Sequence, residues 1–269
     1  MTAAAAVEPT ELEELMEAQA EAAHEREVGD ATRPTAEDLA ASPTRIDVEG
    51  IDLFYGDHHA LKDVNIKIRD KQITSFIGPS GCGKSTLLHI LGLLDSPSSG
   101  QYLLDGKDVS SCSESKRNEL RKGMLGFVFQ SFNLIDELTV QENIALPLLY
   151  MGVPKQERQR RVEEAMARMD IMHRSRHYPR QISGGQQQRT AIARAIVTRP
   201  KLILADEPTG NLDSKNGKEV MGLLSELHRE GTTIVMVTHS QHDAGYADRI
   251  IHLFDGHVLG EEEAGLQNL

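Results

Sequence analysis

Short runs of apolar residues along the chain predict strands that are buried on both faces. These runs are Ile73–Ile77, Leu125–Phe129, Leu202–Ala205 and Thr233–Val237. They are typical of parallel sheets with helices on both sides, whereas a strand with one face in water alternates between apolar and polar residues. The stretch Pro154–Met172 instead predicts a helix, because apolar residues recur along one face at helical spacing. These residues are Val162, Ala165, Met166 and Met169.

Alternating and turn-forming patterns predict further strands outside this core. The front of the chain is strand-like over Ile46–Leu53, and apolar and polar residues alternate strictly over Val64–Ile68. Near the other end, the dipeptide Asp255-Gly256 stands between Ile250–Phe254 and His257–Leu259, and it favours a two-residue hairpin turn. The whole pattern predicts an α/β fold with a mostly parallel core sheet, an N-terminal antiparallel β subdomain and a helical subdomain.

Composition narrows the class of protein. The chain has 269 residues, of which 39% are hydrophobic, so a packed core of one large or two small domains is expected. No apolar run approaches the roughly 18 residues that a bilayer span requires, so we expect no integral membrane segment. Two cysteines, Cys82 and Cys112, are too few for a disulfide framework and fit a reducing cytoplasm.

Acidic residues are concentrated at the front of the chain. Residues 1–45 contribute −8 of the net charge of −12, because they contain 11 acidic residues and only 3 arginines. An acidic chain is not suited to coating nucleic acid, and an acidic N-terminus does not resemble a secretory signal. We expect residues 1–45 to form a disordered, solvated tail rather than a docking segment, with a short helix possible where Thr10 and Glu13 would form a cap. Residues 261–269 are expected to form a C-terminal tail.

A glycine-rich segment predicts a phosphate-binding loop. Residues Gly78–Ser85 match the pattern G-x-x-x-x-G-K-[ST] between a buried strand and an apolar helix. Glycines let backbone N–H groups turn toward phosphate oxygens, and the helix N-terminus adds a partial positive charge. Lys84 would neutralise the β- and γ-phosphates and Ser85 would be a ligand of Mg²⁺, roles that a purely structural glycine turn leaves unexplained. Cys82 is interpreted as a small loop residue rather than a reactive thiol. The residues predicted to bind the nucleotide here are Gly78, Pro79, Ser80, Gly81, Cys82, Gly83, Lys84, Ser85 and Thr86.

Two carboxylates follow another buried strand and predict the second half of a nucleotide site. Asp206 and Glu207 come directly after Leu202–Ala205, and the carboxyl ends of parallel strands line the ligand crevice. Asp206 would hold Mg²⁺ beside Ser85, whereas Glu207, pointing the other way along the strand, would polarise an attacking water. His239 follows the next buried run and is predicted to contact the γ-phosphate, with an ordinary structural histidine as the alternative.

A second glycine-rich segment carries a family resemblance. Ile182–Arg189 reads Ile-Ser-Gly-Gly-Gln-Gln-Gln-Arg and leads into the helical run Gln186–Val197. It predicts another anion-binding helix N-terminus, although one triphosphate needs only one. Together with the phosphate loop and the carboxylate pair, this segment closely resembles the ABC ATPase family. The resemblance covers about residues 46–260, with a helical subdomain at about 131–185, and implies a P-loop NTPase fold of ABC type.

The resemblance also implies roles for individual residues. In that family the signature loop of one subunit covers the ATP held by the phosphate loop of another, so two identical chains are implied to close head-to-tail around two ATP molecules. Tyr55 is implied to stack on adenine, with an ordinary strand-end aromatic as the alternative, and Asn211-Leu212-Asp213 to couple the two sites. The signature loop is implied to be Ser183, Gly184, Gly185 and Gln186, and Asp213 is counted with the nucleotide-binding residues. The implied catalytic residues are Glu207 as base, His239 as switch histidine and Gln130 as sensor of Mg²⁺ and water, and the implied Mg²⁺ ligands are Ser85, Gln130 and Asp206.

Within the family the likeness is mixed. Ile51–Thr86 looks like the ATPase of phosphate importers, whereas Ile90–Asp95, Gly126–Leu134 and Ala205–Asp213 resemble ATPases of the macrolide-exporter and lipoprotein-release type. The segment after Gln130 is implied to recognise the membrane partner through an apolar docking patch. Its residues would be Phe132, Leu134, Leu138, Val140, Leu146, Leu148 and Leu149.

The function implied is that of the ATP-hydrolysing subunit of a bacterial ABC transporter, with ATP and Mg²⁺ as its cofactors. Its implied partners are an integral membrane permease and a second copy of the chain, and its place is the cytoplasmic face of the inner membrane, as a peripheral subunit. No nucleic-acid partner is expected. The first alternative is the ATPase of a phosphate importer, and the second is a soluble ABC protein without a transport role. A plain P-loop kinase or GTPase is the third, but it would not explain the loop at Ser183–Gln186.

Overall fold

The computed structural model describes residues 42–259. The chain divides into two units, residues 1–41 and 42–269, and the described strands and helices all belong to the second. The predicted cap at Thr10 and Glu13 and the predicted C-terminal tail lie outside the described residues, as does most of the predicted N-terminal tail. The first strand begins at Thr44, two residues before the predicted start of the folded domain at Ile46. Among the helices within residues 42–259, none has the length and hydrophobicity of a membrane span.

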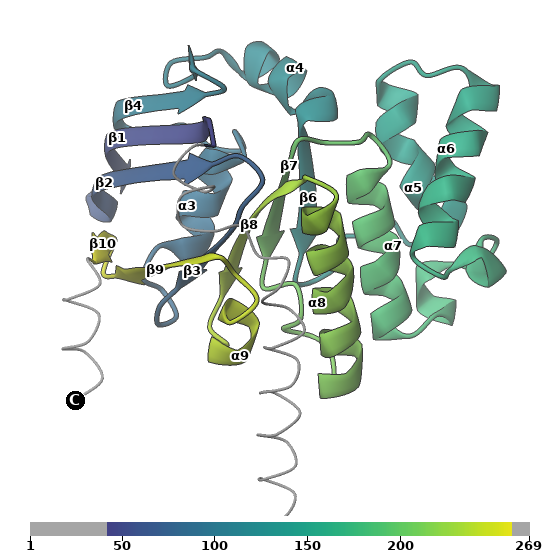
Figure 1. Ribbon diagram of the computed structural model, residues 1–269. Coiled ribbons are helices and arrows are strands. Elements are labelled where there is room, and N and C mark those ends of the chain that lie inside the picture. The colour runs from purple at the N-terminus through teal and green to yellow at the C-terminus, as the bar shows by residue number, and fades with distance from the viewer. Residues whose placement is uncertain (1–41, 260–269) are drawn as a thin grey trace, which may run out of the picture. The chain divides into compact units, whose positions relative to one another are not determined.

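Two sheets form the framework of this unit (Figure 1). The central six-stranded sheet has the order β10-β9-β3-β8-β7-β6, and all neighbours in it are parallel except β10 and β9. The second sheet has four antiparallel strands in the order β2-β1-β4-β5. The strands of the central sheet are β3 (Ile73–Ile77), β6 (Leu125–Phe129), β7 (Leu202–Asp206), β8 (Thr233–Thr238), β9 (Arg249–Phe254) and β10 (His257–Leu259). Those of the antiparallel sheet are β1 (Thr44–Tyr55), β2 (His58–Arg69), β4 (Ser99–Leu104) and β5 (Lys107–Asp108).

The helices differ from the predicted ones mainly at their ends. They are α3 (Lys84–Leu91), α4 (Glu114–Met124), α5 (Val140–Tyr150), α6 (Lys155–Arg168), α7 (Gly184–Ile196), α8 (Ser214–Arg229) and α9 (Gln241–Ala244), with the 3-10 turns η1 (Met172–Arg174) and η2 (Pro179–Gln181). The predicted helix 154–172 is too long, because Asp170 adopts a left-handed conformation (φ 53°) that a right-handed helix cannot continue. Its four predicted apolar residues are buried, which confirms the inward face.

The central sheet is apolar on both faces because alternate residues of each strand belong to different cores. In β7, Leu202 and Leu204 pack with residues of α3 and of the antiparallel sheet. Ile203 and Ala205, which alternate with them along the strand, pack with residues of α5, α6, α7 and α8. This arrangement explains the continuous apolar runs of the sequence, since neither face of the strand meets water. The four predicted core strands are confirmed, each with ends within one residue of the prediction.

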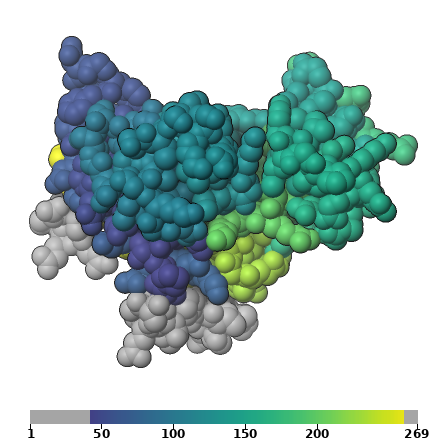
Figure 2. Space-filling model, turned by 90° about the horizontal axis from the view of Figure 1, so that it is seen from above, coloured from purple at the N-terminus to yellow at the C-terminus, as the bar shows by residue number. Residues whose placement is uncertain are grey.

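Part of the predicted docking patch is wrong, because two of its residues in the helical segment after β6 are not exposed. Val140 and Leu148 are fully buried, because they face inward from α5 and pack in the helical core. Large apolar side chains exposed nearby are Ile135, before α5, and three at the end of α5, where Leu149 is 55%, Tyr150 73% and Met151 38% exposed. Figure 2 shows the residues around α5 and α6, in green-teal, gathered in a lobe at one side of the described unit.

Candidate nucleotide-binding site

Strand β3 and helix α3 position the predicted phosphate loop. The strand is buried throughout and ends at Ile77, and α3 begins at Lys84, so Gly78–Gly83 form the connection. Gly83 is the N-cap residue of α3 and has φ 97°, a left-handed conformation that glycine adopts without steric cost. The first N–H groups of a helix have no intrahelical acceptor and point toward its N-terminal end. The loop therefore presents backbone donors and the positive end of α3 at one place, an arrangement that suits a phosphate group.

The side chain of Lys84 lies within this loop. Its ammonium donates hydrogen bonds to the carbonyl oxygens of Gly78 and Pro79, at 2.6 and 2.9 Å, and the residue is only 6% exposed. Cys82 is buried beside it, as a small loop residue would be. A positive charge is thus held at the centre of the loop, where backbone N–H groups alone would supply only partial charges.

A hydroxyl and a carboxylate meet across the sheet. The Ser85 Oγ donates a hydrogen bond of 3.0 Å to Asp206 Oδ1, so the start of α3 and the end of β7 are in contact. Burial raises the pKa of Asp206, and the hydrogen bond from Ser85 acts against that rise. A hydroxyl and a carboxylate oxygen at this separation form a hard oxygen donor set, which is the kind that Mg²⁺ prefers. The residues present therefore fit the predicted cation.

Glu207 reaches its position by a turn of the backbone. The predicted reason, alternation along the strand, is wrong, because β7 ends at Asp206 and Glu207 has a left-handed φ of 45°. The Glu207 N–H donates to the Val237 carbonyl oxygen at 2.9 Å, which fixes the turn against β8. Its carboxylate Oε2 lies 2.8 Å from His239 Nδ1, so the two predicted residues form a pair.

Gln130 joins the same end of the sheet from the edge strand. It follows β6, the neighbour of β7, and its carbonyl oxygen accepts a hydrogen bond of 3.0 Å from Asn211 Nδ2. The Gln130 side chain lies 3.5 Å from Asn211 Oδ1, at the limit of a hydrogen bond. The structure thus brings together residues that follow β3, β6, β7 and β8, since parallel strands end at one edge of a sheet.

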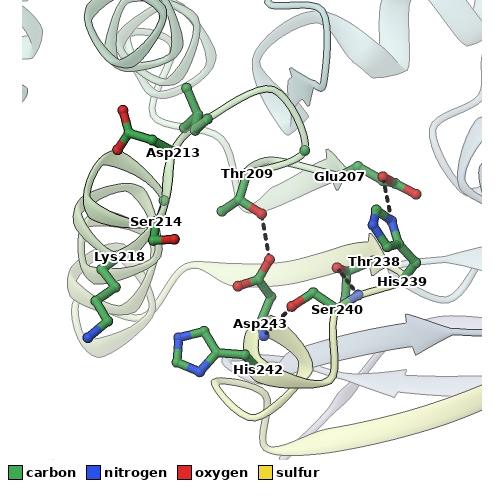
Figure 3. A pocket seen from close by; sticks show the side chains of 13 residues that line it. Glu207, Thr209, Asp213, Ser214, Lys218, Thr238, His239, Ser240, His242 and Asp243 are labelled. Carbon is green, nitrogen blue, oxygen red and sulfur yellow. Dashed lines mark hydrogen bonds and ion pairs between the residues drawn. The ribbon is translucent and has the colours of Figure 1, made fainter. Parts of the chain in front are cut away.

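A pocket of about 510 Å³ adjoins the Glu207–His239 pair (Figure 3). Thr209 and Asp213 line it from the segment after β7, Lys218 from α8, and Asp243 from α9. The carboxylate of Asp213 is the N-cap of α8 and accepts a 2.9 Å hydrogen bond from the Asn216 N–H. Its bonds to the backbone and side chain of Asn216 lower the pKa of Asp213. Asp213 therefore stabilises the loop that contains it by its own hydrogen bonds.

The second glycine-rich loop is built as a helix cap. Ser183 is the N-cap of α7, its Oγ accepts from the Gln186 N–H at 3.3 Å, and Gln186 Oε1 accepts from the Ser183 N–H at 3.2 Å. A Cβ atom at Gly185 would lie 2.2 Å from Asn216 Oδ1, so a larger residue would force the Asn216 side chain of α8 to move. Together these contacts hold the start of α7 against the loop of Asp213.

Not all predicted residues come together in one chain. In Figure 1, α3 and α7 stand on different sides of β7 and β8, so Ser183, Gly184, Gly185 and Gln186 are apart from the phosphate loop. Tyr55 is 50% exposed, and its hydroxyl donates to Asp95 Oδ2 at 2.9 Å, beyond the end of α3 rather than at its beginning. Burial and the bond to Asp95 raise the pKa of Tyr55. Adenine stacking by Tyr55 stays a prediction.

Sequence reasoning missed Arg194, which ties α7 to the segment after Gln130. Its guanidinium donates to the carbonyl oxygens of Asn133 and Phe132 at 2.6 and 2.9 Å. Phe132 and Asn133 both have positive φ angles, 61° and 50°, which are uncommon for residues with side chains. Burial lowers the pKa of Arg194. No sequence signal marks this contact, because the acceptors are backbone atoms about sixty positions away.

Replacing Arg194 with methionine is expected to destabilise the folded protein by about 1.5–3 kcal/mol, the usual range for hydrogen bonds to a charged group. Methionine has a similar length but leaves both carbonyl groups without their donor. Urea unfolding followed by circular dichroism measures the effect. The matched control is Arg199→Met, since the Arg199 side chain is 66% exposed and its loss should leave the unfolding midpoint unchanged. Equal midpoints for the two variants would contradict the role assigned to Arg194.

Comparisons with known proteins agree with this geometry. The family model described as "ABC transporter" matches residues 61–210. An uncharacterized ABC transporter ATP-binding protein, MJ1508 of Methanocaldococcus jannaschii, is 49% identical over 200 residues, which cover 74% of this chain and 89% of that protein. A similar protein of Thermotoga maritima is 46% identical over 207 residues, covering 77% and 88%.

Longer relatives and solved structures are also similar. The macrolide export ATP-binding/permease protein MacB of Chlorobium luteolum is 47% identical over 204 residues, 76% of this chain but only 31% of MacB, so the chain spans less than a third of that relative. The dimeric post-hydrolysis structure of the ATP-binding cassette MJ0796 bound to ADP and Pi superposes with a TM-score of 0.75 at 41% identity. It covers 81% of this chain and 98% of that cassette.

Proposed function

The chain belongs to the ABC transporter family, and we propose that it powers a membrane-embedded partner of the export or lipoprotein-release type. It is an ATP-hydrolysing ABC ATPase with an α/β P-loop fold, and it binds ATP and ADP as the cassettes of this family do. The contact between Ser85 and Asp206 carries the ATPase part of this proposal, because it joins the phosphate loop to the carboxylate strand in one site. The similarity to MacB, an ATP-binding/permease protein, carries the transport part. We assign the residues from Thr44 to Leu259 to the cassette and 131–185 to its helical subdomain.

In this proposal the residues at the strand ends divide the work of hydrolysis. The backbone of Gly78–Gly83, Lys84 and Thr86 hold the phosphates, and Tyr55 stacks on adenine. Ser85, Asp206 and Gln130 would hold Mg²⁺, which would supply positive charge that neutralises the phosphates. Glu207 would accept the proton of the attacking water. His239, whose Nδ1 lies 2.8 Å from Glu207 Oε2, would orient this carboxylate and contact the γ-phosphate.

The second loop fits a role in a second copy of the chain. Ser183–Gln186 forms a capped helix N-terminus that stands apart from the phosphate loop of its own chain (Figure 1). A head-to-tail pair related by two-fold symmetry would place this loop over the ATP of the partner, twice. The MJ0796 cassette, which is similar over most of its length, is described as dimeric in its ADP and Pi state. The contact between Gly185 and α8 then links each signature loop to the Asp213 loop of the same chain.

The membrane partner is proposed to dock at the end of α5. Leu149, Tyr150 and Met151 are three consecutive large apolar residues that are exposed there, and a partner that covers them would remove their apolar surface from water. MacB relatives combine ATP-binding and permease functions in their name, and they are longer than this chain. We therefore propose an integral membrane permease as partner, with this chain peripheral at the cytoplasmic face of the inner membrane.

Replacing Leu149 and Tyr150 together with glutamate is expected to prevent recovery of the permease with the full-length chain, because charged side chains are costly in an apolar interface. Tagged protein is purified from membranes of the native host in mild detergent, and co-purified membrane proteins are identified by mass spectrometry. Ile250→Glu is the control, since Ile250 is 36% exposed on β9, outside the α5–α6 lobe. A wild-type chain that recovers no integral membrane protein would contradict the transport role.

The alternatives are weaker. MacB-type and uncharacterized ABC proteins are among the similar proteins, and the similarity of residues 51–86 to phosphate importers finds no support in them. A plain kinase or GTPase is excluded by membership of the ABC transporter family. A soluble ABC ATPase without a transport role would bind ATP and dimerise but recover no permease, so the co-purification distinguishes it from a transport subunit.

A further inference from the structure

A second link joins the two segments that carry Glu207 and His239 (Figure 3). Thr209, two residues after Glu207, donates the hydrogen bond of its hydroxyl to Asp243 Oδ2 in α9. Asp243 lies four residues after His239, and α9 follows β8 directly. The hydrogen bond therefore connects the segment after β7 with the segment after β8, close to the Glu207–His239 pair.

Asp243 is held in place by burial and by hydrogen bonds of its own segment. It is only 7% exposed, and its backbone N–H donates to Ser240 Oγ at 3.2 Å, which caps α9. The Ser240 N–H in turn donates to Thr238 Oγ1 at 3.0 Å, at the end of β8. A continuous set of hydrogen bonds thus runs from the last residue of β8 through α9 to Thr209. A nearly buried carboxylate that receives a hydroxyl hydrogen bond is costly to leave without its donor.

The Glu207–His239 pair needs such support. His239 has 63% of its side chain exposed, and pairs with an exposed member contribute little to the geometry they adopt, because water and salt screen them. Glu207 also has a left-handed backbone conformation that is unfavourable for a residue with a side chain. The conformation persists only if neighbouring contacts hold it, and Thr209 supplies this segment with a side-chain hydrogen bond to α9.

We propose that Thr209 and Asp243 are positioning residues that hold Glu207 and His239 in the relative positions that ATP hydrolysis requires. The inference rests on the proposed roles of Glu207 and His239 and adds a pair that acts through them. The link joins the segments that carry Glu207 and His239 and is separate from Lys84 and the phosphate loop, which follow β3. We therefore expect it to act on the hydrolysis step rather than on ATP binding. Its loss lowers the turnover number and leaves ATP affinity unchanged.

The test uses valine and serine at position 209 in the full-length chain. Thr209→Val keeps the shape and removes the donor, and kcat should fall about 10- to 100-fold, the range that small misplacements of catalytic groups produce. KM for ATP should stay within about twofold. Thr209→Ser restores the hydroxyl and should recover at least half of the wild-type kcat. Asp243→Asn retains an acceptor oxygen and should do the same, whereas Asp243→Ala should resemble Thr209→Val.

Thr233 offers a matched control. Its hydroxyl donates to Asp70 Oδ1 at 2.7 Å, a largely buried threonine–aspartate bond at the opposite end of β8. Thr233→Val should lower the melting temperature without changing kcat. If Thr209→Val folds poorly, the double variant Thr209→Val/Asp243→Ala removes the unpaired carboxylate, and its kcat should stay low despite restored folding.

The outcomes separate this inference from the function on which it rests. Wild-type kcat in Thr209→Val, or an equal loss in Thr209→Ser and Thr209→Val, overturns the positioning role. A loss of kcat in Thr233→Val equal to that in Thr209→Val overturns it as well, since stability would then explain both. Undiminished hydrolysis by Glu207→Gln would instead overturn the proposed function, whatever the variants of Thr209 do.

Discussion

Glu207→Gln is expected to lower kcat for ATP hydrolysis by about 10²- to 10⁴-fold, the usual contribution of a general base, while ATP still binds. Glutamine has the shape of glutamate, so it fits the turn after β7 and can still contact His239. Its amide cannot accept the proton of an attacking water. The phosphate loop is untouched by the change, because Lys84 and Ser85 belong to α3.

The same variant should accumulate as an ATP-bound dimer. If hydrolysis separates two copies that ATP has joined, a chain that binds but does not hydrolyse stays joined. Size-exclusion chromatography with light scattering, with and without MgATP, gives the mass, and phosphate release gives the rate. Glu230→Gln is the control, because Glu230 is exposed and pairs with Arg168 away from the strand ends. Retained turnover would contradict the assignment of Glu207, and a monomer with bound ATP would contradict the head-to-tail dimer.

The sequence predicts the core of this fold well because burial on both faces leaves a simple pattern. Leu202 and Ile203 are both apolar since each faces a different core, and no choice of register is needed to recognise the strand. The same simplicity fails on α5. Apolar residues there serve both the inner face, as Val140 and Leu148 do, and the outer surface, as Leu149 does. Composition alone does not separate the two, so the predicted docking patch contains residues from both.

The chemistry of the site was easier to predict than its geometry. Lys84 and Asp206 are marked by motifs that place them at strand ends, and topology then brings the ends together. Glu207 is different, because its direction depends on a left-handed turn that no alternation pattern contains. Arg194 and Thr209 were missed for a related reason: their partners are a pair of backbone carbonyls and a carboxylate far along the chain. The residues next to Arg194 and Thr209 in the sequence do not indicate such contacts.

Lys84→Ala is expected to weaken ATP binding itself, by about 10²-fold or more, since removing one partner of a desolvated charge pair costs several kcal/mol. The ammonium lies at the centre of the loop and is 6% exposed, so the charge that it would offer to the β- and γ-phosphates cannot be replaced by water. Folding should be preserved, because the carbonyl groups to which the ammonium donates belong to a loop that can leave them to solvent. Fluorescence titration with a labelled ATP analogue measures Kd, and Lys107→Ala, on the short exposed strand β5, is the control.

The two variants test different steps, and their combination tests the order of the steps. Glu207→Gln should bind ATP and dimerise, whereas Lys84→Ala/Glu207→Gln should do neither at ATP concentrations that saturate the single variant. AMP, which has no β- or γ-phosphate, should bind Lys84→Ala and wild type equally weakly. If the double variant still forms an ATP-dependent dimer, ATP joins the two chains without the phosphate loop, and the site built on Gly78–Ser85 is wrong. If it stays monomeric while Glu207→Gln dimerises, binding at this loop is what brings the second copy in.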